Sequence, residues 1–360
     1  MPILGITASS AKIAPAIPTI GTATNVGTAR AYNNGAATVT FTPGVGVAAT
    51  SFTATSSPGG FTATGASSPL TVAGLQSNTS YTFTVTASNS SGTSAASSAS
   101  NSITATTVPQ APTIGTATLS GSNVTVTYTA GATGGSAVTT FTATSSPGSF
   151  TGTGASPITV SGLSGGTSYT FTVTATNANG TSTASSASNS VFVAYAVGGI
   201  GPGGGRIFYD AGSTLSWGRY LEAAISTTSP SWSDVSQAFS GNTSSSIGTT
   251  GTAIGTGRTN TQDAYAQSST GSKAVSTTWT YTGGGFNSTV NANTGWFLSS
   301  QDELNALYGQ KTTVGGFGAS YYWSSSEFNA SNSYAQDFGG GGQIYDSKSF
   351  DLFVRPIRAF

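Results

Sequence analysis

Alternating apolar and polar residues predict several short strands in the first half of the chain. Tyr81, Phe83, Val85 and Ala87 alternate with threonines, and the same pattern returns at residues 169–175. A period of two places the apolar side chains on one face of a strand and the threonines on the other. Threonine suits the exposed face, because its branched carbon favours extended backbone and its hydroxyl stays hydrated. Such strands, separated by Gly, Pro and Asn turns, are typical of β-sandwiches.

These strands belong to an internal repeat. The segment PTIGTAT occurs at residues 18–24 and again 94 positions later. The segment FTATSSPG recurs 89 positions after residue 52, and YTFTV recurs 88 positions after residue 81. The shrinking offset predicts about six extra residues in the first copy, mostly before residue 52, where a loop tolerates them. We place the two copies at residues 14–107 and 108–194.

Each copy resembles the fibronectin type III family. The shared pattern is a Leu six residues before a Tyr, then Tyr-x-Phe-x-Val-x-Ala-x-Asn-x-x-Gly, at Leu75, Tyr81, Asn89 and Gly92 and again at Leu163, Tyr169, Asn177 and Gly180. The resemblance implies an Ig-like sandwich in which Tyr81 and Tyr169 bond back to the upstream backbone. Relatives carry a large aromatic residue, usually Trp, on an early strand. Here the best candidates are Phe41 and Tyr128, which predicts a smaller core than in most relatives.

Charge is almost absent from the repeats. Lys12 and Arg30 are the only charged residues before residue 195, and the whole chain has 10 basic and 10 acidic residues. Phosphate binding needs a basic surface, so the composition excludes nucleic-acid binding. Without acidic ligands or charged hot spots, the repeats are interpreted as spacers. Uncharged edge strands invite pairing with neighbours, which predicts a homo-oligomer or many copies on one particle.

The missing residue types also limit the chemistry. The chain has no His and no Cys, which removes the usual near-neutral base, the commonest metal ligand, disulfides and thiolate nucleophiles. We therefore expect a non-enzyme with no catalytic residues. No apolar run approaches the roughly 18 residues of a membrane span. The first residues lack the basic and apolar regions of a Sec signal peptide, which favours a virion protein or a cargo of another secretion route.

The second half of the chain has a different composition. All five Trp residues lie between residues 217 and 323, together with nearly all the charge. Ser300 and Glu303 form a capping-box pattern, and Leu304, Leu307 and Tyr308 follow at helical spacing. We predict one helix there, among short strands and long Gly/Ser/Asn loops.

Five phrases of this half together resemble a C-type-lectin-like domain found in phage fibres, Legionella collagen-like adhesins and retroelement-diversified proteins. They are GGRIFYD at 204–210, YLEAA at 220–224, TGWFLSSQDEL at 294–304, YYWSSSE at 321–327 and VRPIRAF at 354–360. The resemblance implies an α+β domain over residues 195–360, with a small twisted sheet, one or two helices and a long loop region that presents ligand contacts.

The predicted ligand contacts lie late in this domain. Aromatic rings stack on sugars or apolar groups, while amides and carboxylates bond hydroxyls in directional pairs. The candidates are Tyr322, Trp323, Phe328, Asn329, Asn332, Tyr334, Gln336, Asp337, Gln343, Tyr345 and Asp346. The resemblance also suggests that residues 328–353 are diversified by a retroelement; a plain Gly/Asn/Ser loop is the alternative, and both stay open.

Other sequence patterns are weaker indications of function. Residues 251–259 evoke a phosphate-binding loop but have Arg258 where Lys is required, so we reject them. The glycine run 198–205 is interpreted as the turn that opens the domain. Arg355 and Arg358 are interpreted as structural ion-pair partners of Glu222 or Glu327. No cofactor is expected, although a calcium site of carboxylates and a pair of hydrolytic acids stay open alternatives for Glu327, Asp337, Asp346 and Asp351.

The sequence thus predicts a mostly β protein with two fibronectin-like sandwiches and a lectin-like domain. We expect a phage fibre or decoration protein on the virion surface, whose tip binds host-surface glycan or protein. Residues 1–13, with an apolar Ile3, Leu4 and Ile6, would attach to other virion proteins. The alternatives are a bacterial cell-surface adhesin, a purely structural capsid or tail protein, and a secreted polysaccharide hydrolase.

Overall fold

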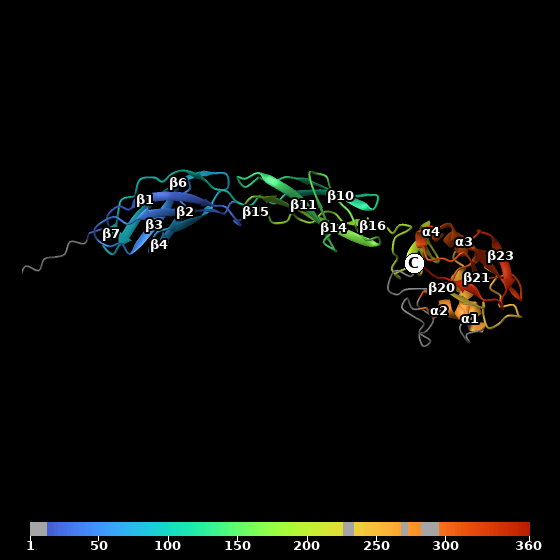
Figure 1. The fold of residues 1–360 in the computed structure, drawn as a ribbon. Helices are drawn as coiled ribbons and strands as arrows, with labels where there is room; N and C mark the ends of the chain where they lie inside the picture. Colours follow the sequence, from blue (N-terminus) through green and yellow to red (C-terminus); the bar gives the residue numbers. More distant parts are fainter. Residues whose placement is uncertain (1–12, 226–233, 268–272, 282–294) are drawn as a thin grey trace, which may run out of the picture. The chain divides into compact units, whose positions relative to one another are not determined.

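The protein is mostly β and divides into two compact units, Met1–Val193 and Ala194–Phe360 (Figure 1). The computed structural model describes residues 13–225, 234–267, 273–281 and 295–360. Ile3, Leu4 and Ile6 of the predicted attachment segment lie outside the described residues, as does Trp232. Within the described ranges, no helix has the length and apolar character needed to cross a lipid bilayer.

The first copy of the repeat is a sandwich of two antiparallel sheets. One sheet has the order β1-β2-β5, and the other has the order β4-β3-β6-β7, with β8 also paired to β6. The strands are β1 (Thr19–Val26), β2 (Gly35–Thr42), β3 (Ser51–Ser57), β4 (Thr62–Gly65), β5 (Leu70–Leu75), β6 (Ser80–Asn89), β7 (Gly92–Thr93) and β8 (Ile103–Thr104).

The second copy repeats this topology strand for strand. Its sheets have the orders β13-β10-β9 and β12-β11-β14-β15, with β16 also paired to β14. The strands are β9 (Thr113–Ser120), β10 (Asn123–Thr129), β11 (Val138–Ser146), β12 (Thr151–Thr153), β13 (Ile158–Val160), β14 (Thr167–Asn177), β15 (Gly180–Thr181) and β16 (Val191–Val193).

The apolar residues of the predicted alternating pattern form the inward faces of β6 and β14. Tyr81, Phe83, Val85 and Ala87 are buried within the first sandwich, as are their counterparts in the second. The predicted tyrosine corner is confirmed, because the hydroxyl oxygen of Tyr81 accepts the N–H of Gln76 and that of Tyr169 accepts the N–H of Ser164, both at 3.0 Å. Each corner ties its strand to the chain just upstream.

A serine ladder replaces part of the last strand in each copy. Residues 94–102 lie outside the strands, yet the hydroxyl oxygen of Ser97 accepts the N–H of Val85 at 2.9 Å while the N–H of Ser97 donates to the Val85 carbonyl. Ser94 and Ser100 make the same pair of bonds to Ala87 and Phe83. The second copy repeats the ladder at Ser182, Ser185 and Ser188. Serines at every third position all face the neighbouring strand when the backbone has three residues per turn.

The extra residues of the first copy form the loop between β1 and β2. Residues 27–34 connect these strands, whereas residues 121–122 suffice between β9 and β10. This longer loop contacts the second copy within the same unit: the N–H of Ala29 donates to the Asn179 carbonyl at 2.8 Å, and the N–H of Val108 donates to the Arg30 carbonyl at 3.0 Å. The insertion predicted from the offsets therefore joins the two copies.

The described residues of the C-terminal unit form two sheets and four helices, many of which are labelled in Figure 1. One sheet has the order β17-β18-β25-β20, and the other has the order β19-β24-β21-β22-β23. The strands are β17 (Arg206–Leu215), β18 (Gly218–Ala223), β19 (Val235–Gln237), β20 (Trp296–Leu298), β21 (Tyr321–Glu327), β22 (Asn332–Asp337), β23 (Gln343–Ser347), β24 (Leu352–Val354) and β25 (Pro356–Ala359). The helices are α1 (Gly257–Gln267), α2 (Ala274–Trp279), α3 (Gln301–Gly309) and α4 (Lys311–Val314).

Helix α3 is the helix predicted from the capping box. Its N-cap Ser300 accepts the N–H of Glu303, and the Glu303 carboxylate accepts the N–H of Ser300 at 2.7 Å. The same carboxylate also accepts the N–H of Gly255 at 2.8 Å, so it fixes the loop that leads into α1. Glu303 is fully buried, and this burial raises its pKa to about 7 against the effect of its hydrogen bonds.

The glycine run that opens this unit wraps around a second buried carboxylate. Glu222 accepts the N–H of Gly203 at 2.8 Å and that of Gly205 at 2.9 Å, and it pairs with Arg358 at 3.6 Å. The predicted structural role of Arg358 is thereby confirmed. Arg355 has a different partner from those predicted: it pairs with Asp234 on the approach to β19, at 2.5 Å.

Candidate functional site

Three aromatic side chains, two of them exposed and one half-buried, form a group on the C-terminal unit. Phe328 and Tyr345 stack nearly parallel, with ring centroids 3.9 Å apart and an interplanar angle of 10°, and Tyr334 meets Phe328 edge-on at 5.5 Å. Phe328 and Tyr345 are 44% and 54% exposed. We call these three residues, with the neighbouring Asn329 and Asn332, the aromatic surface.

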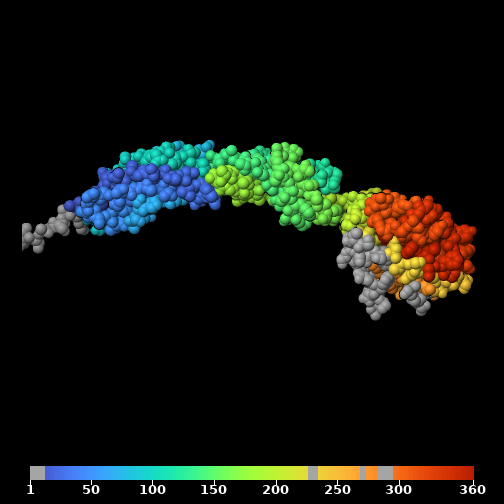
Figure 2. Space-filling view, in the orientation of Figure 1, coloured from blue at the N-terminus to red at the C-terminus, as the bar shows by residue number. Residues whose placement is uncertain are grey.

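The strand register explains why these residues meet. Tyr334 of β22 lies directly opposite Tyr345 of β23, so both side chains lie on the same face of the sheet. Phe328 follows β21 at the start of the turn into β22. Strand β23 is an edge strand of its sheet and lies at the outer side of the unit in Figure 1. The space-filling view shows residues beyond 300, in orange and red, forming much of the visible surface of this unit (Figure 2).

The turn that carries Phe328 is shaped by Asn329. Its side-chain oxygen accepts the N–H groups of Ser331 and Asn332, each at 2.9 Å, while the N–H of Phe328 donates to the Asn332 carbonyl at 3.0 Å. Asn and Asp form such turns because their short side chains reach backbone N–H groups two or three residues on. The amide of Asn329 thus positions the turn as well as bordering the aromatic surface.

A buried ion pair lies beneath this turn. The ammonium of Lys348 binds the carboxylate of Glu327, the last residue of β21, and both side chains are at most 1% exposed. Lys348 also donates to the carbonyls of Ala330 and Ser245, at 2.8 and 3.2 Å. One ammonium therefore joins the turn after β21, the segment after β23 and the loop around residue 245.

The other half of the pair is equally well bonded. Glu327 accepts the hydroxyl of Ser246 at 2.7 Å and the backbone N–H groups of Ile247 and Gly248 at 3.0 Å. Burial acts to raise the pKa of Glu327, but the hydrogen bonds from Lys348, Ile247 and Ser246 outweigh it, and the net direction is downward. Glu327 is thus held as a carboxylate with its oxygens occupied, which leaves it no role as a hydrolytic acid or exposed ligand.

Three of the predicted contact residues are core residues instead. Tyr322, Trp323 and Gln336 are fully buried. The Trp323 indole donates to the Gln237 carbonyl at 2.9 Å, the Gln336 amide donates to the Gly341 carbonyl at 2.8 Å, and the Tyr322 hydroxyl donates to Asp234. Burial first, then the charge of Asp234, raises the pKa of Tyr322. These side chains support the sheet and cannot contact a surface ligand.

Three further candidates lie away from the aromatic surface. Asp337 and Gln343 are at the opposite end of the β22–β23 hairpin, where Asp337 accepts the N–H of Gly339 at 2.7 Å and Gln343 bonds Gln301 of α3. Asp346 lies opposite the buried Ser333, so it is on the other face of the sheet from Tyr345. The structure therefore brings together Phe328, Asn329, Asn332, Tyr334 and Tyr345.

The carboxylates considered for calcium or hydrolysis do not converge. Glu327 is bound to Lys348, Asp337 caps a turn, Asp346 accepts the N–H of Ser347, and Asp351 is exposed. Across the described residues, no group of three or more acidic side chains is placed to hold a metal ion together. What the aromatic surface offers chemically is contact and hydrogen bonding.

Sequence reasoning missed Lys348, which holds the turn beneath the aromatic surface. It lies 21 residues after its partner, and no local spacing rule links them. The signal available was compositional: Lys348 is the single Lys among Ser, Asp and Phe at residues 346–351. Because long charged side chains are rarely buried unless paired, the two could have been matched only once both were known to be inside.

No protein-family model matches the chain, and no curated protein matches it in sequence. Among solved structures, the chicken CNTN1 FN1-FN3 domains are 17% identical over 50% of this chain and 67% of that one, with a TM-score of 0.28. The titin kinase with its flanking domains is 28% identical, and the twitchin kinase region from C. elegans is 22% identical. Each covers 24% of this chain with a TM-score of 0.22, and the chain spans 17% of each.

Proposed function

We propose that the chain is a surface-recognition protein whose C-terminal unit is a lectin-like head that binds host-surface glycan or protein through the aromatic surface. The observation that carries this proposal is the exposed stack of Phe328 on Tyr345. Large aromatic side chains left in water cost free energy that burial against a partner recovers. Rigid rings lose little conformational entropy on binding, which is why they dominate recognition surfaces.

The residues around the stack support a binding role for it, rather than rings that are exposed without a function. The turn beneath it is fixed from below by the buried pair of Glu327 and Lys348, and from within by Asn329. A rigid support holds contact residues in place before the partner arrives and lowers the cost of binding. Tyr345 is the more exposed ring of the stack. It offers both a hydroxyl and an apolar ring face, a combination suited to a sugar or to a protein surface with polar and apolar groups.

The proposal extends to the whole chain. The two nearly uncharged repeats serve as spacers, and the protein is a fibre or decoration component of a phage particle, joined to other virion proteins near its N-terminus. The five phrases of the C-terminal unit that resemble phage-fibre domains support this location. Many copies on one particle would turn a weak single contact into strong attachment. Immunogold labelling of purified particles tests the location; label on the bacterial envelope instead would favour the adhesin.

The binding claim is tested with the intact chain on an array of bacterial surface polysaccharides and envelope proteins. We expect Phe328→Ser and Tyr345→Ser each to reduce retention by about tenfold or more, as removal of a hot-spot aromatic does. The matched control is Phe350→Ser, because Phe350 is also 54% exposed but belongs to no ring contact with the stack. If all three variants bind as the parent does, the aromatic surface is not the contact.

A further inference from the structure

The first repeat carries a group of exposed apolar side chains at its N-terminal end. They come from the segment before β1 and from the loop between β2 and β3: Ile13, Ile17, Val45 and Val47, which are 58%, 51%, 99% and 48% exposed. A Cβ on Gly44 would lie 2.6 Å from the carbonyl oxygen of Ile17, so the loop and the segment are in contact. We call these four side chains the apolar end. Exposed apolar residues are usually scattered singly, so their concentration at one end of a domain indicates an interaction surface.

The corresponding end of the second repeat is built in the same way. There, the side-chain amide of Asn177 donates to the carbonyl of Thr107 at 2.9 Å. In the first repeat, the side-chain amide of Asn89 donates to the carbonyl of Ile13 at 3.1 Å. Asn89 and Asn177 hold the same position in the repeat pattern, and Thr107 follows Ile13 at the offset of 94 that separates the two PTIGTAT segments. What covers this end of the second repeat therefore indicates what covers the apolar end.

In the second repeat, this end is covered by the first repeat. The N–H of Ala29, in the loop between β1 and β2, donates to the Asn179 carbonyl at 2.8 Å. A Cβ on Gly135, in the loop between β10 and β11, would lie 3.1 Å from the Ala105 carbonyl oxygen and 3.2 Å from the backbone nitrogen of Asn78. The occupant of this end is thus the C-terminal end of another β-sandwich, which contacts it through a connecting loop and backbone groups.

The two ends differ in the side chains of their loops. The loops at residues 43–50 and 130–137 have the same length, but Val47 occupies the place of Gly134. Glycine lets a neighbouring backbone approach closely, whereas valine presents apolar surface. Arg30 is the only charged residue in the described part of the first repeat, and it lies in the loop that contacts the second repeat. The occupant of the apolar end is therefore expected to be uncharged and to contact it with apolar side chains as well as backbone groups.

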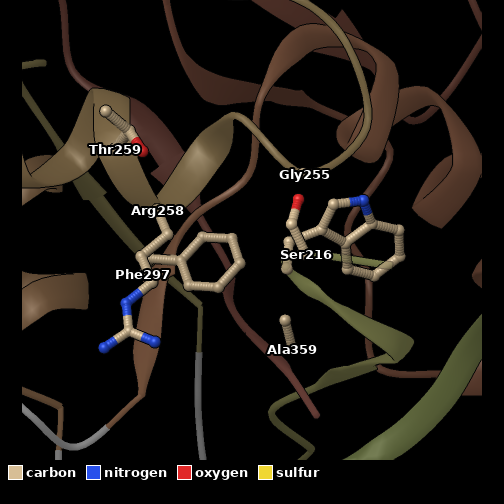
Figure 3. A pocket seen from close by; sticks show the side chains of 7 residues that line it. Ser216, Gly255, Arg258, Thr259, Phe297 and Ala359 are labelled. Carbon is tan, nitrogen blue, oxygen red and sulfur yellow. The ribbon is translucent and has the colours of Figure 1, made fainter. Parts of the chain in front are cut away.

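The cavity beside β20 in the C-terminal unit is a weaker candidate for a partner. Its volume is about 310 Å³, at the lower end of the range for small-molecule sites. Arg258 is the one charged residue among those that line it, and Figure 3 shows the guanidinium directed away from the cavity. The cavity thus lacks a charged group aimed at a ligand, whereas the apolar end has an equivalent in the second repeat whose occupant is known.

We propose that the apolar end docks against the C-terminal end of a β-sandwich domain in the protein to which this chain is attached, as the second repeat docks against the first. The inference rests on the attachment near the N-terminus that belongs to the proposed function, and it adds the kind of domain that receives the chain. Val45 and Val47 supply apolar contact area in place of the close backbone approach at Gly135. The interface contains no ion pair from this repeat, so raised salt should not weaken it.

Cysteine labelling tests the docking in whichever assembly, particle or envelope, carries the immunogold label. The chain has no Cys, so Val45→Cys introduces a single thiol at an exposed position. We expect a maleimide to label this variant about tenfold more slowly in the assembly than in the free chain, because access limits thiol reactivity. Leu119→Cys is the matched control, because Leu119 is also exposed but lies in β9 of the second repeat. Equal labelling of Val45→Cys in both states would overturn the proposal.

Crosslinking from the same thiol identifies the occupant. A maleimide–benzophenone probe on the Val45→Cys variant is photoactivated in the assembly, and mass spectrometry identifies the peptide that it joins. We expect a peptide from a loop at the end of a β-sandwich domain in another protein. A peptide from a second copy of this chain, from residues 1–12 or from a domain of another fold would overturn the proposal.

A charged variant separates this inference from the proposed function. Val45→Asp should reduce incorporation of the chain into the assembly about tenfold or more, because docking would bury an unpaired carboxylate, while Leu119→Asp should not. The free Val45→Asp chain should bind the polysaccharide and protein array as the parent does, and calorimetry of the repeats verifies that they remain folded. Unchanged incorporation of Val45→Asp would overturn the docking alone. Reduced incorporation of Val45→Asp would support the docking even if the parent bound nothing on the array, a result that would overturn the proposed function alone.

Discussion

The repeats and the C-terminal unit both bury polar groups, but they pair them differently. In the repeats, serine hydroxyls and backbone groups bond one another, as in the ladder of Ser94, Ser97 and Ser100. In the C-terminal unit, buried charged side chains bond one another instead, as in the pair of Glu327 and Lys348 and the pair of Asp234 and Arg355. Residues 13–193 contain one charged side chain, Arg30.

The difference teaches how composition sets sensitivity to conditions. A hydroxyl–amide bond does not titrate and is little affected by salt, so a spacer built from such bonds keeps its stability across pH. A buried ion pair fixes a geometry more strictly, but losing either partner leaves an unpaired charge inside. The rigid turn of the aromatic surface rests on the second kind of bonding.

The largest effect should come from breaking the buried pair. Lys348→Met leaves the Glu327 carboxylate without its cation and should cost the C-terminal unit about 3–5 kcal/mol of unfolding free energy. All five Trp residues lie in this unit, so urea titration followed by tryptophan fluorescence reports on it alone. Lys311→Met is the matched control, because Lys311 is half-buried and has no carboxylate partner among the described residues, only the Phe338 carbonyl and the face of the Tyr308 ring.

A double variant sharpens this result. Glu327→Gln combined with Lys348→Met removes both charges and should recover part of the loss, since an unpaired buried carboxylate is the main cost. A loss in Lys348→Met no larger than in the Lys311 control would show that the pair does not support the turn, and the comparison between the two units would fail.

The next effect is a pH dependence confined to the C-terminal unit. Burial raises the pKa of Glu303 from 4.5 to about 7, so between these values the folded protein holds a proton that the unfolded chain has released. Stability therefore falls as pH rises through this window, by up to about 3 kcal/mol. The raised pKa of Glu222 acts in the same direction. The lowered pKa of Glu327 acts oppositely, so its contribution is lost on acidification.

Urea titrations at a series of pH values measure this profile. We expect greatest stability near about pH 5 and a flatter slope above it in Glu303→Gln, whatever that variant costs overall. The calorimetric transition of the repeats should not move over the same range, because they contain no carboxylate side chain. A slope as steep in Glu303→Gln as in the parent would assign the pH dependence to other groups.

The smallest effect should come from one rung of the serine ladder. Ser97→Ala leaves the buried N–H of Val85 without its acceptor and should cost the first repeat about 1–3 kcal/mol. Ser98→Ala is the control, because Ser98 is exposed and contributes only its backbone carbonyl to the ladder. Calorimetry gives the stability, and hydrogen exchange at the Val85 amide locates the change. Equal hydrogen-exchange rates at the Val85 amide in the two variants would show that the serine ladder does not stabilise this strand.

Local sequence patterns were sufficient to predict individual strands and helices whose formation depends on neighbouring residues. The alternation at Tyr81–Ala87 and the capping box at Ser300 were sufficient to place β6 and α3. The ladder escaped prediction, although Ser recurs every third residue in both copies, because apolar periodicity does not detect a strand replaced by hydroxyls.

The candidate site was predicted in part for a similar reason. Tyr322 and Trp323 are adjacent, so alternation should expose one of them, yet Trp323 packs in one hydrophobic cluster and Tyr322 in another. The sheet is covered on both faces, which a period of two cannot reveal. Phe328 and Tyr345 are exposed and Tyr334 is half-buried beside them, but their contact depends on the hairpin register and on Lys348.

The central claim is that the aromatic surface faces outward and meets the partner. Oxidative footprinting of the native assembly, with and without the isolated host envelope, tests it most directly. We predict that Phe328 and Tyr345 are oxidised in the assembly alone and protected when the envelope is added, while Phe350 stays reactive in both. Protection of Phe328 and Tyr345 before any envelope is added would contradict the claim, since the surface would then be an interface between subunits.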